Sequence, residues 1–172
     1  MIETSRRLSL DVPELGLDLP NFETIGGEQL AELLQSKSEE EVIVVDLRGD
    51  DWGGGHVKGS LHIPFSQFEA SLEGFVAEHG QGKKIILHCM YSQSQAPDCM
   101  QRLLARLGDL ESPSQAYVLD GGYHRWINQW ADDEDDLEAL VEDHDPAKWR
   151  FANDHMRLVH DMDHPDTLLG NS

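Results

Sequence analysis

The sequence predicts an α/β fold with a central parallel sheet of about five strands and helices on both faces of that sheet. Nearly continuous apolar runs bounded by polar or charged residues are typical of strands covered on both faces, and they occur at 41–46, 84–89 and 116–120. Helical stretches separate these runs, which favours right-handed crossovers between parallel strands. Ligands of such folds bind beyond the carboxyl ends of the strands.

The remaining elements follow from spacing and from turn residues. The first 20 residues contain two prolines and no sustained period, so we expect an extended arm there. Apolar residues at helical spacing predict an amphipathic helix over 24–35. A short strand is expected over 60–64, where Pro64 ends it because proline cannot donate to a strand ladder. Helices are predicted over 65–79, 97–107, 123–130 and, more weakly, 137–141.

Length and charge limit the classes of partner. The 172 residues fit one domain over 21–131, an N-terminal arm over 1–20 and an acidic, His-rich C-terminal extension over 132–172. Because 33 Asp+Glu oppose 13 Lys+Arg, the net charge of −20 excludes nucleic acid as a partner. No apolar run approaches the roughly 18 residues of a membrane span, and the N-terminus lacks the pattern of a secretion signal. We therefore expect no membrane partner and a cytoplasmic location, with the nucleus also open, while the oligomeric state is not set by the residue types.

The segment 88–97 carries the chemistry. It joins a predicted buried strand to a helix whose first turn contains Pro97, and Cys89 lies at the junction. A loop that curls back over a helix N-terminus points successive backbone N–H groups at one place, where they hold an anion and favour a thiolate. Cys89 is therefore a candidate nucleophile. The alternative is that Cys89 merely ends a core strand, because free cysteine is among the most buried residue types.

Three further segments stand out in order along the chain: 44–48 (VVDLR), 55–64 (GHVKGSLHIP) and 119–126 (LDGGYHRW). They resemble the "D-x-R" strand, the "G-H-I-x-G-A-x-x-I-P" segment and the closing "L-x-G-G-x-x-x-W" of the rhodanese-like domain family. The loop over 88–97 (HCMYSQSQAP) resembles the active loop of the cell-division-cycle type dual-specificity phosphatases and of the eukaryotic arsenate reductases. The resemblance spans roughly 21–130 and leaves out both terminal extensions.

The resemblance implies a reaction in which the Cys89 thiolate attacks phosphorus or arsenic in a tetrahedral oxyanion, either a phosphate ester or arsenate. The implied partner is a phosphorylated protein or a small oxyanion, and neither a cofactor nor a metal is expected. The loop is longer than that of a thiosulfate-type sulfurtransferase. The residues that would form the anion-binding loop are Met90, Tyr91, Ser92, Gln93, Ser94 and Gln95.

One position departs from the family pattern. Six residues after the cysteine the family has arginine, and this chain has Gln95. Glutamine donates neutral hydrogen bonds but brings no charge, and losing one charge-assisted contact with an oxyanion costs roughly 3–4 kcal/mol, or about two to three orders of magnitude in rate. Arg102 should lie more than a turn into the following helix, too far to substitute. We therefore expect weakened activity.

Two alternative functions stay open. The loop can hold an anion or a partner without turnover, as a regulatory module, or Cys89 can carry a persulfide in a sulfurtransferase. The loop itself contains no carboxyl to protonate a leaving group, and the nearest candidates are Asp50, Asp51 and Asp98. The hydroxyl of Ser92 can stabilise a departing thiolate, as the resemblance implies.

The remaining candidates have simpler structural interpretations. Cys99 is either a resolving thiol for a redox cycle or a small residue packed beneath the loop. We expect His124 at the surface, and Trp126 and Trp130 as an anchor that packs a helix on the sheet. The tail combines aspartates with histidines in a pattern that either binds a metal or forms a loose acidic segment, and these histidines are His144, His155, His160 and His164.

Overall fold

The computed structural model describes residues 21–149, and these confirm the predicted fold class. The five strands of the main sheet are parallel and lie in the order β1-β6-β5-β2-β4. Their bounds are Glu23–Ile25 for β1, Val42–Asp46 for β2, Leu61–His62 for β4, Lys84–His88 for β5 and Gln115–Leu119 for β6. The arm predicted for 1–20 lies outside the described residues, as does the last part of the C-terminal extension.

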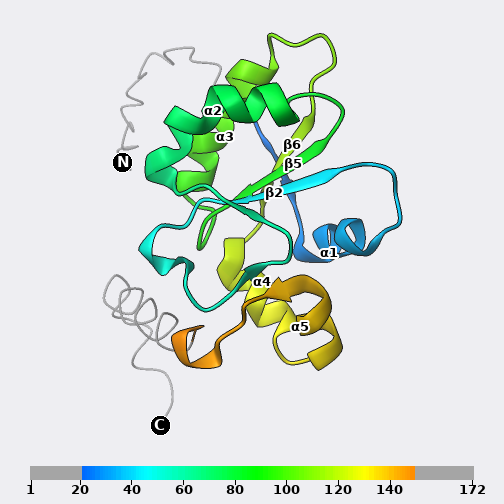
Figure 1. The fold of residues 1–172 in the computed structure, drawn as a ribbon, viewed down its shortest axis with the longest axis vertical. Coiled ribbons are helices and arrows are strands. Elements are labelled where there is room, and N and C mark those ends of the chain that lie inside the picture. Colours follow the sequence, from blue (N-terminus) through cyan, green and yellow to red (C-terminus); the bar gives the residue numbers. More distant parts are fainter. Residues whose placement is uncertain (1–20, 150–172) are drawn as a thin grey trace, which may run out of the picture.

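Helices cover both faces of the sheet (Figure 1). On one face lie α2 (Phe65–His79) and α3 (Gln95–Leu107), and on the other lie α1 (Gly27–Gln35), α4 (Gly122–Trp130) and α5 (Glu134–Leu140). Successive strand residues alternate between the two core clusters, so that Ile85 and Leu87 face α2 and α3 while Ile86 faces α1 and α4. Burial of both faces explains why these strands are continuous apolar runs.

The helix predicted over 24–35 is wrong in its first part. Residues 23–25 form β1, which pairs with β6 and places Ile25 opposite Leu119. The helix begins only after Gly26, the residue that caps α1. A three-residue strand is too short to show a period of two, and Ile25 fits the spacing of either element. The weak helix predicted over 137–141 begins earlier, at Glu134, because the Asp133 side chain accepts from the amides of Asp135 and Asp136.

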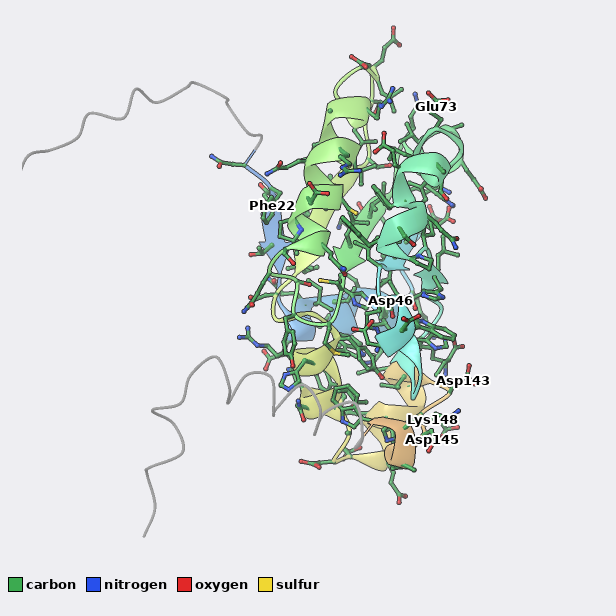
Figure 2. The ribbon with its side chains drawn as sticks, turned by 90° about the vertical axis from the view of Figure 1, so that its left-hand side faces the viewer. Phe22, Asp46, Glu73, Asp143, Asp145 and Lys148 are labelled. Carbon is green, nitrogen blue, oxygen red and sulfur yellow. The ribbon has the colours of Figure 1, made fainter. Side chains whose placement is uncertain are left out.

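A second, smaller sheet joins residues 141–142 to the segment that follows β2. After β2 the chain forms a 3-10 turn, η1 (Asp50–Trp52), and then β3 (His56–Val57), which pairs antiparallel with β7 (Val141–Glu142). Leu140, Val141 and Trp149 are buried in the same core cluster as the residues of α4. Figure 2 shows Asp143, Asp145 and Lys148 gathered at one end of the molecule, far from Glu73 of α2. The division of the chain at residue 131 stays a prediction.

Within residues 21–149, no helix combines the length and the apolar character that crossing a bilayer requires.

Candidate active site

Cys89 lies directly after β5, the middle strand of the sheet, and is 6% exposed. Its Sγ accepts a hydrogen bond from the backbone N–H of Ser92 over 3.2 Å. Ser92 has a φ of +56°, a left-handed conformation that turns the chain back so that this amide points at the sulfur. The loop therefore curls over Cys89 before α3 begins at Gln95, as the sequence predicts.

The residues of the predicted anion-binding loop differ in exposure. Met90 is buried in the core beside α4, Tyr91 and Ser92 are half-buried, and Gln93, Ser94 and Gln95 are exposed. The carbonyl of Ser94 accepts the first bond of α3, from Asp98. The amides of residues 93–95 form no hydrogen bond with any residue of 21–149, which leaves them open to an anion at the start of α3.

The first turn of α4 donates two backbone hydrogen bonds to the loop. The backbone N–H of Tyr123 donates to the carbonyl of Cys89 over 3.0 Å, and that of His124 donates to the carbonyl of Met90 over 2.9 Å. Gly122 permits this approach, because its φ is +60° and a Cβ there would lie 2.5 Å from the Met90 oxygen. Gly122, the second glycine of the closing segment 119–126, therefore allows α4 to approach the loop closely.

The surface position expected for His124 is met only in part, since its side chain lies beside the loop. His124 is half-buried, and its ring lies 5.0 Å from that of Tyr91. Its place in the first turn of α4, where its own amide bonds to the loop, brings the side chain beside the loop. Trp126 is buried in the core cluster and packs edge-to-face on Trp130 at 5.9 Å, in agreement with an anchoring role.

A buried ion pair lies below the loop, at the end of β2. Arg48 donates to both carboxylate oxygens of Asp46, with distances of 3.0 Å and 2.7 Å, and neither side chain is exposed. Arg48 also donates to the carbonyl of Gly55 over 2.8 Å, and its guanidinium lies 3.8 Å from the centre of the Tyr123 ring. This ion pair connects β2, the segment before β3 and the first turn of α4. Sequence reasoning noted Asp46 and Arg48 only as part of the family pattern.

His88 connects that ion pair to the backbone of Cys89. Its Nδ1–H donates to the Cys89 carbonyl over 3.1 Å, and its Nε2 lies 3.8 Å from the Asp46 carboxylate. Burial lowers the pKa of His88 despite the attraction of Asp46, so the ring is neutral near pH 7. Burial alone would raise the pKa of Asp46, but its contacts with His88 and Arg48 outweigh burial and lower that pKa. With His88 neutral, Arg48 is the charge that keeps Asp46 ionised.

The three candidate acids occupy different environments. Asp98 is paired with Arg102 over 2.8 Å, and Arg102 also reaches Glu69 of α2 over 3.0 Å. These two ion pairs occupy the Arg102 guanidinium, in agreement with the prediction that Arg102 does not replace the missing loop arginine. Burial, and then the negative charge of Asp51, raises the pKa of the Tyr91 hydroxyl, so Asp51 is within electrostatic range of the loop. Asp50 is exposed.

Cys99 is fully buried, in the same core cluster as Cys89, and neither cysteine forms a disulfide. Burial, together with the neighbouring charge of Asp98, raises the pKa of the Cys99 thiol to about 12. A thiol in this environment is a poor nucleophile, since the thiolate is the reactive form. These features favour Cys99 as a packed residue beneath the loop over a resolving thiol.

The tail histidines are mostly outside the described residues. Of the four, only His144 lies within residues 21–149, so the two interpretations of the tail, a metal site or a loose acidic segment, both stay open. Within those same residues, no group of three or more His, Cys, Asp or Glu side chains is arranged to hold a metal ion.

Fold and site together define an α/β domain that presents a cysteine in an amide-lined loop at the carboxyl end of its central strand. The model of the rhodanese-like domain matches residues 29–129, and the chain belongs to this family.

Relatives of the chain carry names of two kinds. It is 32% identical over 118 residues to the CDC25-like phosphatase YCH1 of Saccharomyces cerevisiae, covering 62% of this chain and 77% of that relative. It is 26% identical to arsenical-resistance protein 2 of the same yeast, covering 59% of this chain and 85% of that relative. A crystal structure of Saccharomyces cerevisiae Ygr203w, described as a homolog of single-domain rhodanese and the Cdc25 phosphatase catalytic domain, superposes with a TM-score of 0.63 at 26% identity, covering 76% of this chain and 93% of that one.

Proposed function

We propose that this protein hydrolyses phosphate monoesters through Cys89, at a reduced rate. In the first step the Cys89 thiolate forms an S–P bond while the P–O bond to the leaving group breaks, and the leaving oxygen takes a proton from water. In the second step water attacks phosphorus, the S–P bond breaks, and inorganic phosphate and the thiolate are released. The substrate class is a phosphorylated protein or a small phosphate ester.

The hydrogen bond from the Ser92 amide to the Cys89 sulfur carries this proposal. An amide that points at a sulfur atom stabilises its anionic form. The free amides of residues 93–95 lie on the same loop, where they can bind the oxygens of a tetrahedral anion. The Ser92 hydroxyl has no partner within residues 21–149, so it is available to stabilise the departing thiolate in the second step.

Gln95 is the reason for the reduced rate. Its side chain is exposed and forms no hydrogen bond with any residue of 21–149, so it is free to reach a bound anion. It offers no positive charge, and Arg102 is held by Asp98 and Glu69. The charge that develops on the transition state is therefore stabilised by neutral donors, the loop amides and Gln95, which supports a loss of about two to three orders of magnitude in rate.

Arsenate reduction is the second candidate, and it is supported by the relative named arsenical-resistance protein 2. Reduction of arsenate to arsenite needs two electrons, which a pair of thiols supplies as they form a disulfide. The burial of Cys99 and its pKa of about 12 disfavour it as the second thiol. This reaction would then require a small thiol as co-substrate, whereas ester hydrolysis requires only water.

Two further functions are outcomes of the same experiment. Turnover of 4-nitrophenyl phosphate is measured for the wild type and for Cys89→Ser, together with alkylation of Cys89 by iodoacetamide in the presence and absence of inorganic phosphate. The proposal predicts slow turnover that Cys89→Ser abolishes, and protection of Cys89 by phosphate. Protection without turnover would instead assign a regulatory module that binds an anion, and turnover of thiosulfate alone would assign a sulfurtransferase.

A further inference from the structure

Residues 141–149 form a strap that returns to the active-site side of the domain. They lie beyond the segment that the family model matches, which ends at residue 129. Trp149, near the end of the strap, is 9% exposed. Its ring packs edge-to-face on Tyr123 with the centres 5.5 Å apart and lies 6.2 Å from the ring of His124.

These two neighbours of Trp149 are the residues whose amides hold the loop. Tyr123 donates to the Cys89 carbonyl, and His124 donates to the Met90 carbonyl. Tyr123 is thus fixed from two directions, by Trp149 at 5.5 Å and by the Arg48 guanidinium at 3.8 Å. Because side chains in a packed interior transmit small displacements, a shift of either ring moves the amide on the same residue.

The strap itself is docked at a fixed register. Val141–Glu142 pairs with β3, and the Glu142 carboxylate lies 3.2 Å from His56 Nε2 while accepting from the Gly59 amide over 3.1 Å. Further along, the amide of Asp145 donates to the Gly54 carbonyl over 3.1 Å. Gly54 has a φ of +98°, and a Cβ at that position would lie only 2.9 Å from the backbone nitrogen of Trp149. The strap and the domain therefore fit closely.

We propose that Trp149 is a positioning residue for Cys89, acting through Tyr123 and His124. Its indole packs the first turn of α4 against the loop, so that the Ser92 amide stays aligned with the sulfur. The inference rests on the proposed function, since it concerns the same loop. A misplacement of reacting groups by about 1 Å can cost a hundredfold in rate, so a contact of this kind matters although Trp149 does not touch the substrate.

The test compares Trp149→Ala with Trp130→Ala in the full chain. Trp130 is the matched control because it is the last residue of α4, at the end of the helix away from the loop, where its ring packs on that of Trp126. The rate of Cys89 alkylation is followed against pH by mass spectrometry, with and without inorganic phosphate, and kcat and KM are measured on 4-nitrophenyl phosphate. Circular dichroism reports whether each variant is folded.

The proposal predicts that Trp149→Ala slows alkylation of Cys89 at neutral pH by roughly tenfold, because the Ser92 amide no longer stays aligned with the sulfur. It predicts a larger fall in kcat than rise in KM, recovery in Trp149→Phe, and wild-type behaviour in Trp130→Ala. A folded Trp149→Ala protein with the wild-type pH profile and kcat would overturn it. A uniform loss in both tryptophan variants would also overturn it, since that result describes general destabilisation.

A substitute variant and a measurement that needs no substrate keep the test decisive. If Trp149→Ala does not fold, Trp149→Leu takes its place, because leucine keeps apolar volume without the ring, and the same two results support or overturn the inference. If the wild type shows neither turnover nor phosphate protection, the proposed function fails on that ground alone. The role of Trp149 is then decided by the pH dependence of alkylation, which needs no substrate.

Discussion

The guanidinium of Arg48 lies 3.8 Å from the centre of the Tyr123 ring, and the backbone amide of Tyr123 holds the Cys89 carbonyl. A single residue therefore connects the buried ion pair at the end of β2 to the loop that follows β5. This relation makes the conformation of the loop depend on residues that lie outside it.

Arg48→Met is expected to destabilise the domain by roughly 3–5 kcal/mol, because it leaves the Asp46 carboxylate buried without its partner. Urea denaturation measures the free energy of unfolding. Arg106→Met is the control, since Arg106 is exposed on α3, and it should change stability by less than roughly 0.5 kcal/mol. Equal effects of the two substitutions would show that the buried ion pair is not important for stability.

Gly122→Ala is expected to distort the loop and to lower stability by roughly 1–3 kcal/mol. Its φ of +60° disfavours alanine, and the added Cβ would meet the Met90 and Cys89 carbonyl oxygens at 2.5 Å and 2.6 Å. In the same variant, inorganic phosphate should no longer protect Cys89 from alkylation by iodoacetamide. Gly74→Ala, in the middle of α2 with open space around it, should be stabilising by roughly 0.5–1 kcal/mol. If phosphate still protected Cys89 from alkylation in Gly122→Ala, the hydrogen bonds from α4 to the loop would not be needed for anion binding.

His88 predicts a specific pH dependence of stability. Burial lowers its pKa in the folded state, so the unfolded chain takes up a proton near about pH 6.5 while the folded protein does not. Stability is therefore full above that pH and falls as the pH is lowered through it towards the folded pKa, by at most roughly 1.4 kcal/mol per pH unit. Asp46, whose folded pKa is also lowered, adds a further loss in more acidic solution.

The measurement for His88 is denaturation of the wild type and of His88→Asn at several values between about pH 7 and pH 5. Asparagine can still donate to the Cys89 carbonyl but does not titrate. The slope of stability against pH should be smaller in the variant. The same slope in both proteins would assign the acid sensitivity to other histidines.

Cys99→Ala should keep turnover within about twofold of the wild type and cost roughly 1 kcal/mol of stability. Cys99 is fully buried, and its pKa of about 12 disfavours a role as a thiolate. Steady-state kinetics and urea denaturation check the two parts of this prediction. A Cys89–Cys99 disulfide formed during turnover, with loss of multiple turnovers in the variant, would restore the resolving-thiol interpretation.

Local patterns predicted most of the fold, because the strands of the sheet interior are buried on both faces. The apolar runs at 41–46, 84–89 and 116–120 correspond to β2, β5 and β6 within a residue at each end, and α2 has the predicted bounds. The missed strands are β3 and β7, of two residues each, and β1, which is too short to show a period and gains its identity only by pairing with β6. Tertiary contacts of this kind leave little trace in a short segment.

The site was predictable only where its residues are contiguous. Cys89 and its loop occupy one segment, whereas the residues that hold the loop come from other parts of the chain. Tyr123 and His124 act through backbone amides, which no side-chain pattern reports, although the two glycines before them are a usable signal. The contact of His56 with Glu142 joins residues 86 positions apart. The contacts of Trp149 with Tyr123 and His124 could not be predicted, because they depend on the pairing of β3 with β7.

The kcat/KM of Gln95→Arg on 4-nitrophenyl phosphate, measured beside the wild type and Gln95→Arg with Cys89→Ser, tests the central claim most directly. In the proposed function the loop binds a tetrahedral oxyanion without the help of a positive charge, so the arginine should raise kcat/KM by at least about tenfold. The gain should disappear when Cys89 is also changed to serine. An unchanged kcat/KM in Gln95→Arg, or a gain that survives the loss of Cys89, would contradict phosphoryl transfer at this loop.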